Sequence, residues 1–327
     1  MKTFLDNFVD FVSEFSVTDK NYIKYTGLMA ISTMLGNRVY FEAGTRKIYT
    51  NMYMMFIADS GISCKSEAPY VLCQSFLKKL EKNSGVDKEF VFPSRFSIEE
   101  FVKSMSKNPS GIFYFDEYSD FLAMLERNSS KGIIDKLTQY YEFGGGIDNL
   151  RYLSWSADVI DPSPSFLTAT TKTALTSNSK TSQVTDQFRK GFNNRFIYIL
   201  GEKPDKFYEV QPSYNRELHG TILYQLRQLL DIRGMCKFNS EASKWFSQWC
   251  QSEFKICQSG KCGEFYPSYF MRLQRIISKL SILYQINSDN YDLNNIIIDS
   301  KSMEIALCEA EFLKHYFSTY YLDNVFP

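Results

Sequence analysis

The chain has 327 residues and no net charge, because 37 lysines and arginines balance 37 aspartates and glutamates. Hydrophobic residues make up 44% of it and aromatic residues 16%, which excludes a disordered chain and predicts a globular protein of one large domain or two. Proteins that coat nucleic acid along one face are usually basic, so neutrality argues against that class. A neutral chain could still form a ring of several copies with a narrow basic channel.

Seven cysteines are scattered irregularly along the chain. An odd count without regular spacing is typical of reduced thiols and predicts a cytoplasmic protein. Cys250, Cys257 and Cys262 form a cluster in sequence, but they lack the C-x2-C pair of zinc sites, so we expect no metal there. No apolar run reaches the ~18 residues that span a membrane, and no signal-peptide pattern opens the chain. We therefore expect a soluble protein without membrane contact.

The hydrophobic pattern predicts helices and strands that alternate from the start of the chain. Two helices, 3–16 and 19–36, should form a hairpin that packs on a sheet; binding of a partner is the alternative role. A strand within 52–58 has an apolar run without alternation, which is typical of a strand buried on both faces. Further helices are expected over 66–82, 97–107 and 118–142, and further strands over 39–41, 90–92, 111–115, 151–160, 165–171 and 196–200.

The segment from Met52 to Ser66 is the first candidate for chemistry. A strand, a tight turn and the start of a helix follow one another, and Lys65-Ser66 stands where a phosphate-binding loop has its lysine and hydroxyl. The pattern G-x-x-x-x-G-K-[ST] requires glycine where this chain has Asp59 and Cys64. With one extra residue in the loop, Ala58 takes the first glycine position and Gly61 supplies the permissive backbone. The alternative is a Lys-Ser pair at a helix start with no ligand, which is common.

The helix that follows directs its free N–H groups and positive dipole end at this turn, which is the physical basis of phosphate binding. The whole turn is therefore the predicted nucleotide site, made of Ser60, Gly61, Ile62, Ser63, Cys64, Lys65 and Ser66.

A second signal is the adjacent acid pair Asp116-Glu117, which follows four large apolar residues of a predicted strand. A buried strand has no structural need for two acids at its carboxyl end, whereas a site that hydrolyses phosphates does. Asp116, with Ser66, would hold Mg²⁺, and Glu117 would polarise the attacking water. Ligands of open α/β sheets gather at the carboxyl ends of strands, so both acids should face the Lys65 loop. The alternative is an acidic start of the next helix.

Two later elements could complete such a site. The predicted strand 165–171 ends in hydroxyls, and Thr170 or Thr171 could position the attacking water; threonine chosen for strand propensity is the alternative. Arg195 begins the next strand and is a candidate arginine finger, in cis or on a neighbouring subunit, with Arg189 a weaker candidate. The alternative for Arg195 is an edge arginine that reaches into solvent.

Residues 204–214 read as a linker, and the remainder is expected to be helical, like a lid on a nucleotide-binding core. Arg272 and Arg275 could contact phosphates from this lid, or could form a solvated basic face. The predicted division is an N-terminal helical segment over 1–48, an ATPase core over 49–203 and a C-terminal helical lid domain over 204–327.

Several motifs occur together in the order found in a known family. They are Tyr49-Thr-Asn51, Ser60-Gly-x-x-x-Lys65-Ser66, Ser97-Ile-Glu-Glu, Asn108-Pro-Ser-Gly-Ile-Phe-Tyr-Phe-Asp-Glu117, Gly191-x-x-x-Arg195-Phe196 and Arg272-Leu-x-Arg-Ile-Ile-Ser-Lys279-Leu. Over nearly its whole length the chain resembles a large domain-of-unknown-function family of P-loop ATPases from prophages, plasmids and other mobile elements. Members are described as candidate replicative helicases and are often fused or adjacent to primases.

The resemblance implies an α/β fold with a RecA/AAA-like P-loop core, a mostly parallel central sheet, N-terminal helices and a C-terminal helical lid. It also implies ATP with Mg²⁺, and Lys65, Ser66, Asp116, Glu117 and Arg195 match the functional positions. DNA, expected to be single-stranded, and further copies of the chain are the implied partners. The chain departs from the family at Ala58 and Cys64, where small glycines are usual, and it lacks a primase domain, so priming would need a separate protein.

Three functions fit these features. The first is a DNA-dependent ATPase motor that serves replication of a mobile element. The second is a nucleotide-gated regulator or loader that binds a protein partner and translocates nothing. The third is a kinase on a P-loop fold, which the acid pair disfavours, because activation of water would waste ATP.

Overall fold

Four short strands, almost entirely buried, pair in parallel as a sheet of order β4-β7-β3-β8. They are β3 (Tyr53–Ile57), β4 (Ile112–Phe115), β7 (Ser165–Thr170) and β8 (Phe196–Leu200). The computed structural model that contains them describes residues 2–59, 63–83, 88–151, 155–172, 174, 191–201, 214–260 and 266–317. The predicted α/β class with parallel pairing is confirmed at this level. Burial on both faces explains why these strands show apolar runs in place of alternation.

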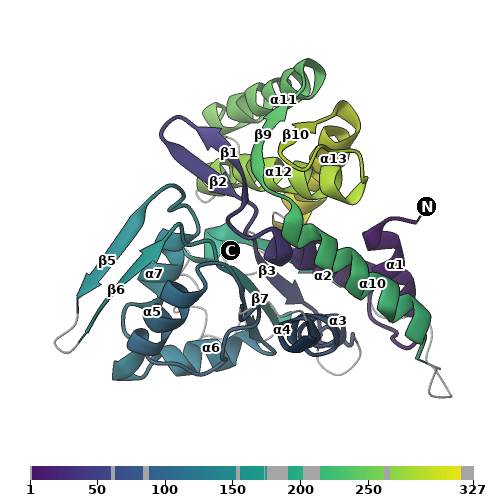
Figure 1. Cartoon of the computed structure of the whole chain (residues 1–327). Helices are drawn as coiled ribbons and strands as arrows, with labels where there is room; N and C mark the ends of the chain where they lie inside the picture. Colours follow the sequence, from purple (N-terminus) through teal and green to yellow (C-terminus); the bar gives the residue numbers. More distant parts are fainter. Residues whose placement is uncertain are drawn as a thin grey trace.

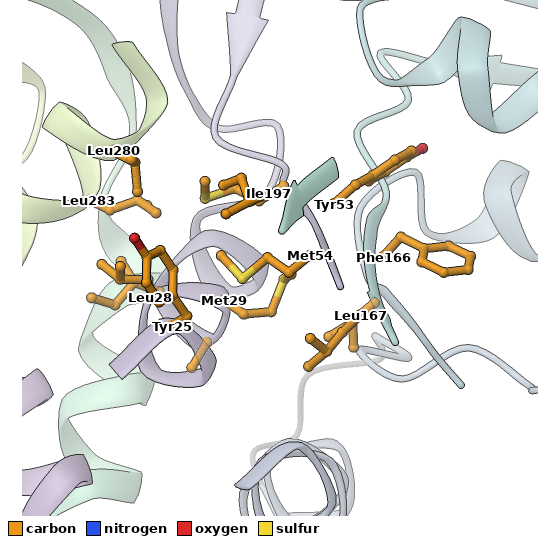
Figure 2. Packing of buried hydrophobic residues seen from close by; sticks show 14 of the residues in the cluster. Tyr25, Leu28, Met29, Tyr53, Met54, Phe166, Leu167, Ile197, Leu280 and Leu283 are labelled. Carbon is orange, nitrogen blue, oxygen red and sulfur yellow. The ribbon is translucent and has the colours of Figure 1, made fainter. Parts of the chain in front are cut away.

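Helices cover both faces of this parallel sheet. On one face, α2 (Lys20–Leu35) lies against the sheet and α1 (Phe4–Ser13) packs on α2, so the predicted helical hairpin is confirmed. Figure 2 shows Met29 of α2 beside Met54, while Tyr53 points away to the opposite face. On that face α6 (Tyr118–Leu125) and α7 (Ile133–Tyr140) cover the sheet, and the Tyr53 hydroxyl donates to the Leu137 carbonyl at 2.8 Å.

A second four-stranded sheet, of order β10-β9-β1-β2, joins distant parts of the chain. β1 (Val39–Ala43) pairs antiparallel with β2 (Arg46–Tyr49) and parallel with β9 (Gly234–Phe238), which also pairs parallel with β10 (Asn295–Ile298). Figure 1 shows this sheet beside α11 (Ser240–Gln258), α12 (Tyr266–Asn287) and α13 (Ser300–Tyr316).

The expectation that the chain is purely helical after residue 204 is therefore wrong at β9 and β10. Both strands are short, with five and four residues, and they stand between long amphipathic helices. β9 pairs with β1, a partner much earlier in the chain, and β10 pairs with β9, so local periodicity carries no record of these pairings.

The remaining elements follow the local signals closely. A helical run joins α3 (Glu67–Tyr70), a π-helical stretch (Val71–Leu77) and α4 (Lys78–Asn83). α5 (Ile98–Lys107) begins with the predicted capping box, in which the Ser97 amide donates to Glu100 at 2.7 Å. The hairpin of β5 (Ile147–Arg151) and β6 (Ser156–Ile160) projects from the body, and α10 (Arg216–Gln228) packs on α1 (Figure 1). The predicted strand 90–92 is reduced to a single bridge between Val91 and Ile112.

Because Met54 is fully buried in the central strand, Met54→Ala should lower the free energy of unfolding by about 2–5 kcal/mol. Met271→Ala is the matched control, since Met271 is 56% exposed on α12, and it should change stability by less than about 0.5 kcal/mol. Urea denaturation followed by circular dichroism measures both. Equal losses in the two variants would contradict a core centred on β3.

Candidate functional site

The carboxyl ends of β3, β4 and β7 meet at one edge of the parallel sheet. The register pairs Ile57 of β3 with Thr170 of β7, and the Ala58 amide donates to the Thr170 carbonyl at 3.3 Å. β7 lies between β3 and β4, so the end of β7 stands between the Lys65 loop and the acid pair. We call this side of the sheet the carboxyl edge.

Lys65 and Glu117 meet at the carboxyl edge. The Lys65 ammonium lies 3.2 Å from Glu117 Oε1, and the Lys65 side chain is 9% exposed while that of Glu117 is 37% exposed. Lys65 and Ser66 form the turn that leads into the helical run from Glu67, and Glu117 begins α6. The predicted approach of the acid pair to the lysine loop is therefore present, with a direct ion pair between the two elements.

Cys64, which stands at the second glycine position of the phosphate-loop pattern, has a backbone φ of +45°. L-residues with a side chain rarely adopt this left-handed conformation, which glycine adopts readily. The Thr18 hydroxyl donates to the Cys64 carbonyl at 2.6 Å, so the turn is tied to the segment before α2. The backbone at Cys64 thus has a conformation that suits glycine, although this residue carries a side chain. Ser60, Gly61 and Ile62 lie outside the described residues.

Asp116 and Ser66 are linked by Tyr114. The Tyr114 hydroxyl lies 2.9 Å from Asp116 Oδ1 and 3.4 Å from the Ser66 carbonyl. Burial, followed by the charge of Asp116, raises the pKa of Tyr114, so its phenol stays protonated and donates to these oxygens. Sequence reasoning missed Tyr114. Its position two residues before Asp116 could have indicated it, because side chains i and i+2 share one face of a strand.

The donor set around Asp116 fits magnesium. Mg²⁺ in nucleotide sites takes one or two protein oxygens and fills its other positions with phosphate oxygens and water. An exposed Asp116 carboxylate beside Ser66 supplies such oxygens. Within the described part of the chain, no three His, Cys, Asp or Glu side chains gather as a self-sufficient metal cage.

Thr170 ends β7 at the carboxyl edge, as predicted from the sequence, but its side chain is only 1% exposed. Thr171 is half-buried, and its hydroxyl accepts from the Ala174 amide at 3.1 Å. The structure thus places both residues beside the loop after β3. The role of Thr170 in positioning water stays a prediction.

Arg195 lies at the opposite edge of the sheet. It precedes β8, whose five residues run parallel to β3 and span about 16 Å at ~3.3 Å per residue. Its side chain is 8% exposed, and Nη2 lies 3.7 Å from Glu142 Oε2. A finger in cis would need to reach Lys65, and the position of Arg195 at the opposite end of β8 corrects that part of the prediction. A role in trans stays a prediction, and Arg189 falls outside the described residues.

Arg272 and Arg275 also lie at that opposite edge, where both contact Glu142. Both arginines therefore lie away from the predicted phosphate loop, and their pairing with Glu142 means that they do not make up a freely solvated basic face.

Beside the carboxyl edge, a cavity of about 790 Å³ is lined by Asp116 and Tyr114, by Lys78 of the helical run and by Asp120 and Arg127. A space of this size matches the ~300–1,000 Å³ of small-molecule sites. Among the described residues that line it, Asp116 belongs to the predicted site, whereas Lys65, Ser66 and Glu117 lie outside the lining.

The left-handed backbone at Cys64 generates a prediction about stability. Cys64→Gly should be more stable than Cys64→Ala by about 0.5–1 kcal/mol, because glycine relieves the positive φ and alanine keeps its Cβ. Thermal and chemical denaturation of the two variants provide the comparison. If alanine equals or exceeds glycine, the turn does not hold the conformation described here.

Comparison of the chain with protein-family models finds no match, and comparison with curated proteins finds none either. Within the described residues, every helix is too short or too polar to cross a membrane. The case for function therefore rests on the residues and geometry of the site.

Proposed function

We propose that the chain binds ATP with Mg²⁺ at the carboxyl edge of its parallel sheet and hydrolyses it. The observation that carries this proposal is the 3.2 Å contact between Lys65 and Glu117. In a P-loop ATPase the loop lysine binds the terminal phosphates and a strand-end carboxylate activates the water that attacks them. Both groups must therefore lie beside the same phosphate, and here two separate strands bring them together.

Each side chain of the carboxyl edge has a defined role in this mechanism. Lys65 binds the β- and γ-phosphates, while the amides of residues 63–66 and the start of the helical run face the phosphate chain. Ser66 and Asp116 would hold Mg²⁺, which when bound neutralises charge that develops on the phosphates. Tyr114 holds Asp116 in place through its 2.9 Å hydrogen bond.

The Lys65–Glu117 ion pair links binding to chemistry. When phosphates arrive, the Lys65 ammonium exchanges the Glu117 carboxylate for phosphate oxygens. Glu117 is then free to accept a proton from the attacking water as general base. Without nucleotide the base remains paired, so the pair suppresses the base until substrate is bound.

We assign this ATPase to a motor that translocates on or unwinds DNA, with single-stranded DNA as the expected track. The support is the motif order that resembles mobile-element ATPases, and the supported setting is replication of a phage, plasmid or other mobile element. A homo-oligomeric ring would allow a neutral chain to present a basic pore. A separate primase would supply the primers.

A second candidate is a nucleotide-gated regulator or loader that binds ATP and a protein partner without translocation. Cys64 favours it, because a side chain occupies a position where P-loops use glycine for close approach of the backbone to phosphate. A site of this kind could bind nucleotide and turn it over slowly. The adjacent general base Glu117 makes a kinase the least supported of the three functions.

Two single variants separate binding from hydrolysis. Lys65→Ala should lose ATP binding, because it removes the ammonium that faces the phosphates. Glu117→Gln should keep ATP binding and lose turnover by about 10²–10⁴-fold, the contribution typical of a general base. Lys82→Ala, at an exposed lysine at the end of the same helical run, is the matched control and should behave as wild type.

ATP turnover, measured with and without single-stranded DNA, together with nucleotide binding by calorimetry, decides among the functions. Turnover that DNA stimulates and Lys65→Ala abolishes supports the motor. Retained ATP binding without turnover supports the regulator. Absence of ATP binding by the wild-type chain would overturn both.

A further inference from the structure

Three arginines gather around one carboxylate at the amino-terminal edge of the parallel sheet. Arg275 Nη1 lies 2.5 Å from Glu142 Oε1, Arg195 Nη2 lies 3.7 Å from Oε2, and Arg272 also contacts Oε1. They come from the turn before β8 and from α12, while Glu142 follows α7. The side chain of Arg195 is 8% exposed, whereas those of Arg272 and Arg275 are 24% and 36% exposed, so solvent screens the charge of Arg195 least.

The charges of this cluster do not balance. Burial by itself would raise the pKa of Glu142, but Arg195 and then Arg272 and Arg275 outweigh it and lower that pKa, so the carboxylate is ionised. Lys279, one turn along α12, is left out of the count, since burial holds its pKa well below the usual value. One carboxylate against three guanidiniums leaves an excess of two positive charges. Charges withdrawn from solvent are normally paired, so this excess favours the binding of a further anion.

A cavity of about 480 Å³ adjoins the cluster. Arg195 and Glu142 line it together with Arg46 of β2 and with Asp135 and Thr138 of α7. Among the described residues, Arg195 Nε and Thr138 Oγ1 are buried and have no hydrogen-bond partner. Arg195 is only 6% exposed, so its guanidinium is held in place at the wall of this cavity. We call this space the amino-edge cavity.

We propose that the amino-edge cavity binds a doubly charged phosphate group, with Arg195 and Arg46 as its direct ligands and Arg272 and Arg275 as supporting charge. A planar guanidinium matches phosphate oxygens with two parallel hydrogen bonds. A phosphomonoester carries about −1.5 to −2 charges, which offsets the excess of two, whereas a single carboxylate offsets only one. Arg46 and Asp135 balance each other on the wall and leave this count unchanged.

This site is separate from the proposed ATP site, because it lies at the opposite end of the strands. Anion binding at the amino-edge cavity therefore does not depend on ATP hydrolysis at the proposed site that contains Lys65. The phosphate could belong to a free nucleotide or to the 5′ end of a DNA strand, and both present the same dianionic group. The cavity volume lies within the range that holds a molecule of nucleotide size.

The test uses the full chain with Lys65→Ala, which disables the first phosphate site, and inorganic pyrophosphate as the probe. Calorimetry should show that Lys65→Ala alone still binds pyrophosphate. Adding Arg46→Gln, at an exposed position of β2, should weaken binding by at least about tenfold, the value of one charged hydrogen bond. Adding Arg195→Gln should have an equal or larger effect. Arg227→Gln, at an exposed arginine on α10, is the control and should leave binding unchanged.

Glu142→Gln provides a readout that a purely structural cluster would not give. The substitution removes the carboxylate that competes with the anion. In the Lys65→Ala background, pyrophosphate should therefore bind about tenfold more tightly, and it should raise the melting temperature more than it does in Lys65→Ala alone. Competition by 5′-phosphorylated but not by unphosphorylated oligothymidylate assigns the site to a strand end. Competition by nucleotides alone assigns it to a small molecule. The proposal is overturned if Lys65→Ala abolishes pyrophosphate binding, or if Arg46→Gln and Arg195→Gln bind it as the control does.

Discussion

Parallel pairing of β7 with both β3 and β4 is the constraint on which the rest of the structure depends. Helices bury both faces of this sheet, so its strands can neither slip in register nor reverse without exposing apolar side chains. The pairing carries the three strand ends that bear Lys65, Glu117 and Thr170 to one edge. It also directs the starts of β3 and β8 to the other edge, where α12 packs.

The two edges have opposite chemistry although the whole chain is neutral. At the carboxyl edge, Lys65 stands beside the acid pair, which suits a site that must hold Mg²⁺ and activate water. At the amino edge, three arginines share the single carboxylate of Glu142, which suits an anion. The zero net charge therefore hides a separation of charge along the strands, and this separation supports the two proposed phosphate sites more than composition does.

The C-terminal part of the chain is bound to the core at more than one point. β9 pairs with β1, and Lys279 Nζ of α12 donates to the Asn51 carbonyl at 2.6 Å, just before β3 begins. The same nitrogen lies 3.7 Å from the centre of the Tyr141 ring. A buried lysine with these contacts fixes α12 against the sheet, and Arg272 and Arg275 on that helix are thereby held beside Glu142.

The sequence by itself determined the α/β class, the helical hairpin, the capping box at Ser97 and the approach of Lys65 to Glu117. Those features follow from local periodicity, capping chemistry and the rule that parallel strands end at a common edge. Tertiary structure alone decided that β9 and β10 are strands, because β9 depends on pairing with the distant β1 and β10 depends on pairing with β9. It also decided the place of Arg195. The sequence located this arginine at a strand start, but the direction of β8 and the burial of its guanidinium against Glu142 arise from contacts between distant segments.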